Sequence, residues 1–539
     1  MTFRFNLIIT ALAITTAAIH AETTATIYGS LKTPTPEHEV FLTFSEEIPS
    51  LGTDHFKVTN GKVASTSGKG RYWSAAITAA SPGDVSITLS GDLKSNTWTT
   101  ACTSDFGDRW IVDDQASWVA SKNNAEGLEL VDGFATPNTT KATFTSTTKS
   151  YPTKKKARTL TLTQSPVWDN WIEVPNIGPK EARDAPVLLP VGKGNYYLLA
   201  LFKQSEGYHA WHSTDMKTWT HKGPVAAPKT GRWTTSAEYK DGTFYIYSDH
   251  YNDHTPHLFT DTDLGDGKVG KYHGAVFEKE ASGSDCSLFR DNADGLFHLI
   301  YEDWSPLNAR KHSWDSPLAG HTTSEDGLTG FTAHEHQPPI DFRTKPTGKI
   351  QTYDHPNKKN VPYEVHTPEQ DAFGDWTTIK VGSRYYMFAD YDPAGKHIRV
   401  ARFTSDSIYK EFKLVGELGK GHPDPTVGFA EGQFYLITQQ KTDYISPGPW
   451  VDGVEARAGV DVDNDGKIDQ WTDWEKVSEQ YDYTPNFIRC VTTTPAQIDL
   501  TNLPAGHGFK FEFRVDDTVV KNVSPIMDRV EMKFEPGDK

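Results

Sequence analysis

Five similar segments recur in the middle of the chain, and this repeat limits the possible folds more than any other feature. Each segment has an acidic or polar residue, a short apolar run, a turn that contains glycine, and an aromatic-rich run. The five copies read DAPVLLPVGKGNYYLLALF, TSAEYKDGTFYIYSDHY, SDCSLFRDNADGLFHLIYED, GDWTTIKVGSRYYMFADYD and PDPTVGFAEGQFYLITQQ. Their spacing of roughly 40 to 90 residues brackets the length of a four-stranded propeller blade with loop insertions. The sequence therefore predicts an all-β protein, with a five-bladed β-propeller and accessory β-sandwich domains.

The composition excludes several other classes of protein. Helical periodicity is almost absent from the repeated block, which disfavours a TIM barrel. With 54 Lys+Arg against 71 Asp+Glu, the net charge of −17 argues against a nucleic-acid partner. The 36% hydrophobic and 12% aromatic content is enough for packed cores, so global disorder is excluded. Cys102, Cys286 and Cys490 are too few for a disulfide scaffold, and their odd number leaves at least one thiol unpaired within the chain.

The N-terminus has the features of a secretory signal peptide. Residues 1–21 contain Arg4, an apolar run from Phe5 to Ala18, and the small Ala21 where a signal peptidase can cut. The apolar run is shorter than the roughly 20 residues that a membrane-spanning helix needs. We therefore expect a secreted or periplasmic protein that has no membrane association once the signal is removed.

Short strands and turn residues flank the repeated block on both sides. Residues 22–104 alternate apolar and polar positions between Asn-Gly and Pro-Gly turns. The stretches FKVTNGKV and PGDVSITL resemble bacterial immunoglobulin-like modules, a resemblance that implies a spacer without chemistry. We expect a β-rich accessory segment over 105–168, which pairs with 470–539, and the propeller over 169–455. A loop resembling calcium loops follows over 456–475, and a C-terminal β-sandwich segment over 476–539; a separate, purely C-terminal sandwich is the alternative.

The repeat also indicates which acidic residues meet at the propeller axis. Because the innermost strand of each blade begins near the axis, residues at the head of each copy point into one shared pocket. Those positions hold Asp184, Ser236 or Glu238, Asp285, Asp375 and Asp424, with Glu369 and Asp371 just upstream of the fourth copy. Converging carboxylates repel one another unless a metal, a substrate or a proton offsets their charge. Glycoside hydrolysis uses such a group of acids, one protonated and one ionised.

The central block resembles the five-bladed β-propeller glycoside hydrolases of family 43, which are related to family 117. The resemblance covers about half of the chain and rests on the phrases ARDAPVLL, GSDCSLFRDNADG and HTPEQDAFGDW. It implies that Asp184 is the general base and that Asp285 orients the acid and adjusts its pKa. Glu369 is the implied general acid. Asp371 and Asp375 stay open for that role, and Asp424 is a further candidate, because the Glu-Gly-Pro of the family is absent here.

Aromatic, histidine and arginine residues near these acids suit sugar binding. Flat rings stack on sugar faces, and His or Arg binds hydroxyls. The candidates are Trp211, Trp233, His250, Trp304, His366 and Trp376. Arg183 and Arg310 suit an acidic or sulfated sugar, and the resemblance makes His422, in GHPDPTV, a candidate metal or water ligand. The alternative for most of the tryptophans is a place in the blade cores.

A separate acidic loop, DVDNDGKIDQW, has the pattern of a calcium site. Carboxylates alternate with Gly at the sixth position, which provides the oxygen cage that Ca²⁺ prefers. The proposed ligands are Asp461, Asp463, Asp465, the carbonyl of Lys467, and Asp469. The motif resembles EF-hand and dockerin loops, although Thr472 replaces the Glu at position twelve. We expect structural Ca²⁺ here, with a solvated acidic turn as the alternative.

Together these features predict a secreted glycoside hydrolase that uses an inverting acid/base mechanism and no organic cofactor. The expected substrate is a plant or marine algal polysaccharide or oligosaccharide, of the arabinan/xylan type or the galactan/anhydrogalactose type. The Asn-Asp-Pro-Asn phrase of family-32 fructosidases is absent, which disfavours a retaining fructosidase. Two alternatives remain: a non-catalytic carbohydrate-binding propeller and a polysaccharide lyase.

Overall fold

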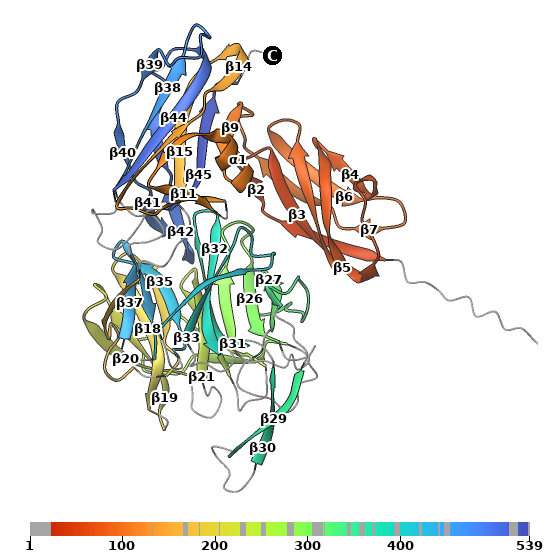
Figure 1. Cartoon of the computed structure of the whole chain (residues 1–539). Helices are drawn as coiled ribbons and strands as arrows, with labels where there is room; N and C mark the ends of the chain where they lie inside the picture. The colour runs from red at the N-terminus through yellow and green to blue at the C-terminus, as the bar shows by residue number, and fades with distance from the viewer. Residues whose placement is uncertain are drawn as a thin grey trace, which may run out of the picture. The chain divides into compact units, whose positions relative to one another are not determined.

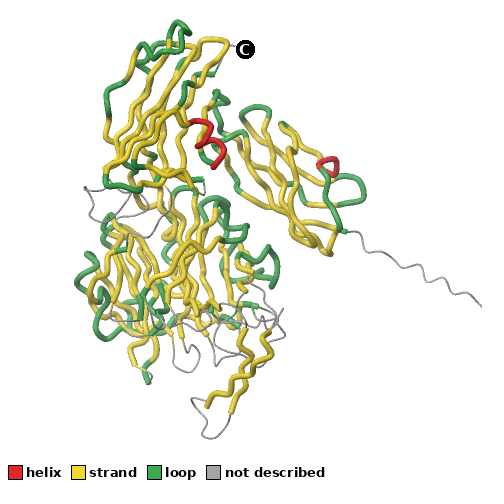
Figure 2. Tube along the Cα trace, in the orientation of Figure 1, coloured by secondary structure: helices red, strands yellow, loops and turns green. Residues whose placement is uncertain are grey.

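The computed structural model describes most of the chain beyond the N-terminal 22 residues. The described ranges are 23–131, 133–164, 171–182, 184–203, 205–226, 233–249, 255–277, 285–303, 316, 318–341, 346–354, 362–368, 372–392, 399–419, 423–439, 442–446, 453–516 and 526–536. Within these ranges the side chains of residue 249, residues 342–372 and residue 392 are left aside. Strands dominate the described part, with one short α-helix, α1 (Gln115–Ser121), and one 3₁₀ turn, η1 (Thr53–His55), as Figure 2 shows. The predicted all-β class is confirmed.

The chain divides into two compact units. The first contains residues 1–29 and 33–102, and the second contains residues 30–32 and 103–539. Among the described residues, no helix is long and apolar enough to cross a membrane. All three cysteines are buried and none is in a disulfide.

The first unit is a β-sandwich of two four-stranded sheets. One sheet has the order β5-β3-β1-β7, and the other β2-β8-β6-β4. The strands are β1 (Thr24–Gly29), β2 (Lys32–Thr33), β3 (Glu37–Ile48), β4 (Phe56–Thr59), β5 (Gly61–Ala79), β6 (Gly83–Leu89), β7 (Lys94–Ser95) and β8 (Trp98–Cys102). Alternate residues point inward, so that Ile27, Phe44 and Ile87 are fully buried between the sheets. The predicted Asn-Gly turn is present, with Asn60 at φ 57°.

Five antiparallel sets of four strands form the propeller blades of the second unit, and the fourth set is part of a six-stranded sheet (Figure 1). Blade 1 is β17 (Val187–Gly192), β18 (Asn195–Lys203), β19 (Gly207–Ser213) and β20 (Trp219–Ala226), and blade 2 is β21 (Trp233–Lys240), β22 (Thr243–Asp249), β23 (His257–Asp261) and β24 (Lys271–Ala275). Blade 3 is β25 (Cys286–Arg290), β26 (Phe297–Glu302), β27 (Leu318–Ser324) and β28 (Ile340–Asp341), and blade 4 is β31 (Ala372–Val381), β32 (Arg384–Asp392), β33 (Arg399–Ser405) and β34 (Lys413–Leu418). Blade 5 combines β35 (Thr426–Ala430), β36 (Gln433–Ile437) and β37 (Thr442–Ser446) with β16 (Ile172–Pro175). The first strand of the block therefore completes the last blade and closes the ring.

A hairpin accounts for part of the long interval between the third and fourth repeats. It consists of β29 (Pro346–Asp354) and β30 (Pro362–Pro368), which pair with each other between blades 3 and 4 in the chain. An insertion of this kind lengthens a connection without altering the blades, because each blade satisfies its own ladder of hydrogen bonds.

The innermost strands β17, β21, β25, β31 and β35 contact one another in a ring. Side-chain hydroxyls join neighbouring blades: Thr426 Oγ1 accepts from Leu188 N at 2.9 Å, and Ser236 Oγ accepts from Leu288 N at 2.8 Å. Apolar side chains fill the space between blades, for example Leu199 and Ile246 between blades 1 and 2. The ring therefore holds the heads of these strands around one axis.

Segments on both sides of the propeller in the sequence combine into one β-sandwich. The strands before the propeller are β9 (Arg109–Val112), β10 (Lys122–Glu126), β11 (Leu128–Val131), β12 (Phe134–Pro137), β13 (Lys141–Ser146), β14 (Lys149–Lys155) and β15 (Ala157–Gln164). Those after it are β38 (Val454–Asp461), β39 (Gln470–Trp471), β40 (Glu475–Val477), β43 (Ala496–Asp499), β44 (Gly506–Asp516) and β45 (Met527–Phe534). β13 pairs with β44, and β15 pairs with β45. The expected propeller boundary at residue 455 lies inside β38, a strand of this sandwich.

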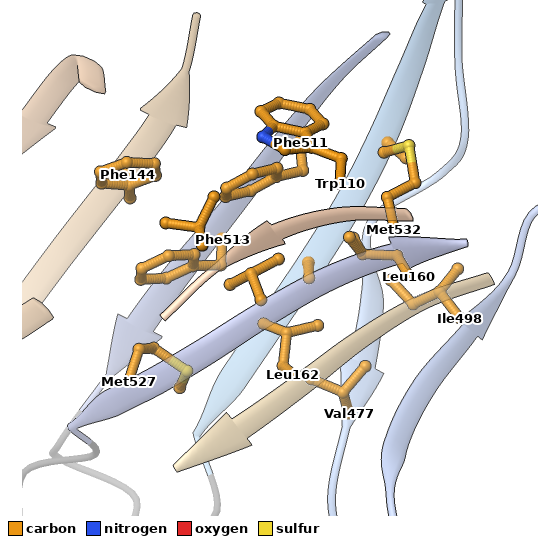
Figure 3. Close-up of a cluster of buried hydrophobic side chains, with 14 of the residues drawn as sticks. Trp110, Phe144, Leu160, Leu162, Val477, Ile498, Phe511, Phe513, Met527 and Met532 are labelled. Atoms are coloured by element: carbon orange, nitrogen blue, oxygen red, sulfur yellow. The ribbon is translucent and has the colours of Figure 1, made fainter. Parts of the chain in front are cut away.

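The sandwich core is rich in aromatic side chains (Figure 3). Phe144 of β13 stacks on Phe513 of β44 with ring centroids 5.3 Å apart, and Trp118 of α1 meets Phe144 edge-on at 5.3 Å. Trp110 contacts Phe511 at 5.0 Å. Large buried rings from the segments before and after the propeller thus pack against one another and stabilise the sandwich.

One hairpin leaves the sandwich and joins the propeller. It is formed by β41 (Gln480–Thr484) and β42 (Phe487–Thr494). β42 pairs in parallel with the last residues of β31, Lys380 opposite Cys490 and Val381 opposite Val491, and it contacts β17, β21, β25 and β35 as well. β42 therefore lies across the end of the axial channel where the innermost strands finish.

Candidate active site

Acidic residues from three blades meet at the end of the axis where the innermost strands begin. Asp184 precedes β17, Asp424 precedes β35, and Asp375 lies near the start of β31. Asp375, Asp424 and Ala185 have positive φ values of 46°, 39° and 40°. Left-handed conformations are uncommon for residues other than glycine, and they concentrate at functional sites.

Asp424 is the most buried of these three residues. Its backbone N–H donates to Asp390 Oδ1 at 2.8 Å, and its Oδ2 accepts from Ala185 N at 3.1 Å. Carboxylate oxygens of Asp375, Asp390 and Asp424 lie within 4.8 Å of one another. Burial, followed by the charges of Asp375, Asp390 and Asp184, raises the pKa of Asp424 well above its usual range. The raised pKa favours the protonated form of Asp424, whose side chain shares a hydrogen bond with Asp184.

Asp184 is half-buried and is oriented by aromatic neighbours. Trp233 Nε1 donates to Asp184 Oδ2 at 3.1 Å, and the Tyr208 hydroxyl lies 3.4 Å from the Asp184 carbonyl oxygen. Burial beside Asp184 and Asp424 raises the pKa of Tyr208 well above its usual value, so this phenol stays neutral. The Trp233 indole is thus a neutral donor that orients the Asp184 carboxylate, and the Tyr208 phenol bonds to the Asp184 backbone.

Blade 3 contributes a second group of polar residues at the head of its innermost strand. Asp285 precedes β25 and is half-buried, and its carbonyl accepts from Glu302 N at 2.9 Å. The adjacent Asp303 is buried and pairs with His334 Nδ1 at 3.3 Å. Sequence reasoning missed Asp303, His334 and Asp390, because they lie outside the repeated head position that identified the other acids.

Two of the predicted sugar-binding tryptophans lie inside the blades. Trp211 is 2% exposed and packs beside Phe202 and His221, with centroid distances of 6.2 and 5.4 Å. Trp376 is 1% exposed and packs on Phe373, with the centroids 5.9 Å apart. Neither ring presents an exposed face to a ligand here. Trp233 is half-buried and is the one that contacts Asp184.

Several predicted residues lie outside the described part of the chain. They are Arg183, His250, Trp304, Arg310, Glu369, Asp371 and His422. His366 belongs to β30, of which only the backbone is described. The predicted general acid Glu369 is thus not placed by the structure.

Glu238 bridges the innermost strands of blades 2 and 3 and is not part of the acidic cluster. Its side chain accepts from Tyr239 N at 2.9 Å and from Arg290 N at 3.1 Å. Burial raises the pKa of Glu238 to about 7, while Arg489 acts to lower it. Ser236, the alternative at this repeat position, joins blades 2 and 3 through the bond to Leu288 described above.

The acidic loop after β38 brings three of its five predicted calcium ligands close together. Carboxylate oxygens of Asp461, Asp463 and Asp469 lie within 4.8 Å of one another. Asp461 is 1% exposed, and its two oxygens accept from the backbone N–H groups of the turn, Asn464 at 2.7 Å and Gly466 at 2.9 Å. These are hard oxygen donors, the type that suits Ca²⁺.

The Asp465 carboxylate, a fourth predicted ligand, pairs with the backbone N–H and the ammonium group of Lys467. Asp465 Oδ1 accepts from Lys467 N at 2.8 Å, and Lys467 Nζ lies 3.4 Å from Asp465 Oδ2. The loop residues thus fit a divalent cation through Asp461, Asp463 and Asp469.

Comparison with known proteins gives structural similarity at low sequence identity. No family model matches the chain, and no curated protein does. An endo-arabinase from Bacteroides thetaiotaomicron is 12% identical at TM-score 0.35, over 51% of this chain and 96% of that one. An α-L-arabinofuranosidase from Clostridium thermocellum is 14% identical at TM-score 0.33, over 54% and 93%. An exo-β-1,3-galactanase from Phanerochaete chrysosporium is 10% identical at TM-score 0.35, over 67% and 100%. Similarity at this level does not define an activity, which has to be inferred from the residues of the site.

Proposed function

We propose that this protein is a secreted glycoside hydrolase that cleaves a plant or marine algal polysaccharide or oligosaccharide by inversion. The observation that carries the proposal is the convergence of Asp184, Asp375, Asp390 and Asp424 at the axis, where burial raises the pKa of Asp424. Hydrolysis of a glycosidic bond needs a protonated acid and an ionised carboxylate on opposite sides of the bond. The substrate type, arabinan/xylan or galactan/anhydrogalactose, follows the sequence resemblance around Asp184 and Asp285.

In the proposed mechanism Asp184 is the general base. It takes a proton from a water molecule as the water oxygen attacks the anomeric carbon and the glycosidic bond breaks. The general acid gives its proton to the departing oxygen; Glu369 is our choice, with Asp371 and Asp375 as alternatives, and Asp285 orients the acid. Asp424 shares a side-chain hydrogen bond with Asp184, which orients the base.

The first experiment tests activity with a panel of plant and red-algal polysaccharides and their oligosaccharides. We expect saturated sugars, released with inversion at the anomeric carbon as measured by NMR. Asp184→Asn should reduce the rate about 10² to 10⁴-fold. Asp406→Asn, at an exposed carboxylate in a loop of blade 4, is the matched control and should leave the rate unchanged. An equally active Asp184→Asn variant would overturn the assignment of the base, and product with retained configuration would overturn inversion.

A carbohydrate-binding propeller without catalysis is the second candidate. The observation that favours it is the group of oxygens from Asp375, Asp390 and Asp424, which could hold a cation instead of working on a substrate. Binding to the same panel without any released sugar would support this candidate. An unsaturated product would instead indicate a polysaccharide lyase.

We also propose two properties that concern the rest of the chain. The signal-like residues 1–21 are removed on export, and mass spectrometry of the mature protein tests the cleavage after Ala21. Ca²⁺ binds the loop of Asp461, Asp463 and Asp469 and has a structural role there. The grouping of their oxygens supports this role.

A further inference from the structure

We propose that Arg489 of the C-terminal strand β42 is a positioning residue for the axial carboxylates, so that the site is complete only with the β41–β42 hairpin in place. The inference rests on the proposed hydrolase function. Arg489 is 3% exposed and lies in the channel beneath the acidic cluster. No sequence pattern connects it with the propeller, because it lies more than 40 residues beyond the last blade strand.

The guanidinium of Arg489 bonds to four of the five innermost strands. Nη2 donates to Ala237 O of β21 at 2.9 Å and lies 3.4 Å from Leu188 O of β17. Nη1 lies 3.5 Å from both Thr377 Oγ1 of β31 and Val427 O of β35. Because the guanidinium is planar and rigid, its fork fixes the relative heights of the strands that it joins.

Three of these four strands carry the axial acids. Thr377 follows Asp375 by two residues, Val427 follows Asp424 by three, and Leu188 follows Asp184 by four. A strand rises about 3.3 Å per residue. Each bond to Arg489 therefore lies only two to four residues along the strand from an axial carboxylate. A shift of one strand along the axis would move its carboxylate by the same amount.

Arg489 carries a charge in a place where charge is costly. Burial lowers the pKa of Arg489, and the carboxyl of Glu238 acts to raise it. A buried cation is tolerated when it is paired and its donors are satisfied. Carbonyl and hydroxyl oxygens from four blades provide this satisfaction, and an apolar side chain would not join those blades to one another.

Other contacts hold the hairpin independently of Arg489. The Tyr483 hydroxyl lies 2.8 Å from the Tyr196 hydroxyl of blade 1, and Arg290 Nη1 donates to Asn486 O at 2.9 Å. Gly382 N donates to Val491 O at 2.9 Å. A substitution at Arg489 should therefore leave the hairpin docked and remove only its link to the strand heads.

The test compares Arg489→Met and Arg489→Lys with Arg384→Met. Arg384 of β32 pairs with Asp528 of β45, so Arg384→Met removes a link between propeller and sandwich away from the channel. We expect Arg489→Met to lower kcat roughly tenfold to hundredfold with KM within about twofold, because the carboxylates shift while sugar contacts remain. Arg489→Lys should recover part of kcat. Arg384→Met should lower the melting temperature but leave kcat unchanged.

Amide hydrogen exchange separates this inference from the proposed function. Arg489→Met should speed exchange in β17, β31 and β35 relative to β44 of the sandwich, whether or not the wild type cleaves any sugar of the panel. An inactive wild type with this exchange pattern would overturn the hydrolase proposal only. Exchange unchanged in all three strands, or a folded Arg489→Met variant with wild-type kcat, would overturn the role of Arg489.

Discussion

The surroundings of Asp424 at the propeller axis penalise a further negative charge, which raises the pKa of this carboxyl. Its side chain is buried and its neighbours Asp375, Asp390 and Asp184 are all acidic. Neutral donors nearby, the indole of Trp233 and the Ala185 N–H, orient the acids without cancelling their charge. The raised pKa of Asp424 favours a proton on this member of the cluster, and acid/base chemistry uses a protonated carboxyl of this kind.

Asp424→Asn tests this proton directly. The pKa of Asp424 is raised on folding, so its stabilising contribution is present below the unfolded value of 3.8 and is lost as pH rises through the folded pKa. The amide side chain of the Asp424→Asn variant does not titrate, so the variant does not lose stability in this way as pH rises. Thermal unfolding between about pH 4 and pH 9 should show that the melting temperature of the variant increases relative to that of the wild type as pH rises. A constant difference across this range would contradict the protonated state.

At the scale of elements, three buried histidines of blade 3 pack against Tyr409 of blade 4. His298 Nδ1 and His321 Nε2 are 2.9 Å apart, and His336 lies beside His321 with ring centroids 4.8 Å apart. Asp294 pairs with His298 at 3.2 Å. Nearby, Lys380 Nζ lies 2.7 Å from Asp291 Oδ1. The negative charge of the Asp291 carboxylate is therefore balanced by a cation of the protein itself. The stack is best explained as a structural contact between blades.

The histidines should make stability fall in mild acid. Burial, then the neighbouring histidines His336 and His298, lowers the pKa of His321 well below 6.5, so the unfolded chain binds a proton that the folded one does not. This contribution is complete above pH 6.5 and is lost as pH decreases below it. Unfolding in denaturant from pH 7.5 to pH 5.5 should show a smaller pH slope for His321→Gln than for the wild type. Equal slopes would mean that His321 does not supply this dependence.

The acidic loop after β38 is the second element with a testable property. At a Ca²⁺ concentration about 100 times the dissociation constant, binding should add about 2.7 kcal/mol to the free energy of unfolding. Thermal unfolding with Ca²⁺ and with EDTA measures this gain. Asp463→Ala should remove it, and Asp406→Ala, at an exposed residue elsewhere, should retain it. If the wild type has the same melting temperature with Ca²⁺ and with EDTA, the loop is a solvated acidic turn and not a calcium site.

At the scale of the whole molecule, the chain folds as two units of different construction. The first unit uses sequence that is continuous except for residues 30–32, whereas the second joins strands from both sides of the propeller into one sandwich. β42 then extends from this sandwich to the propeller channel. Loss of the sandwich core should therefore affect the propeller as well.

Scanning calorimetry of two matched variants tests this division. Phe513→Ala in the sandwich and Phe44→Ala in the first unit each remove a fully buried ring, at a cost of about 3 to 5 kcal/mol. Phe513→Ala should lower the transition of the second unit, propeller included, and Phe44→Ala only that of the first. A propeller transition that Phe513→Ala leaves unmoved would contradict the coupling.

The sequence by itself determined the five blades, because glycine turns and short apolar runs are local signals that need no distant partner. The repeated segments also identified Asp184, Asp375 and Asp424 as residues at the heads of the innermost strands. The structure brings these three residues together. The pattern also marked Trp211 and Trp376 as candidates, although their rings are buried among Phe202 and Phe373. Composition cannot distinguish a ring in a core from a ring at a surface.

Only the tertiary structure decided how the ring closes and what lies inside it. β16 completes blade 5 across more than 250 residues, and Arg489 enters the channel from a strand beyond the last blade. Asp390 joins the acidic cluster from a second strand, outside the repeated position. These contacts depend on packing between residues far apart in the sequence, and local periodicity does not predict which distant residues will meet.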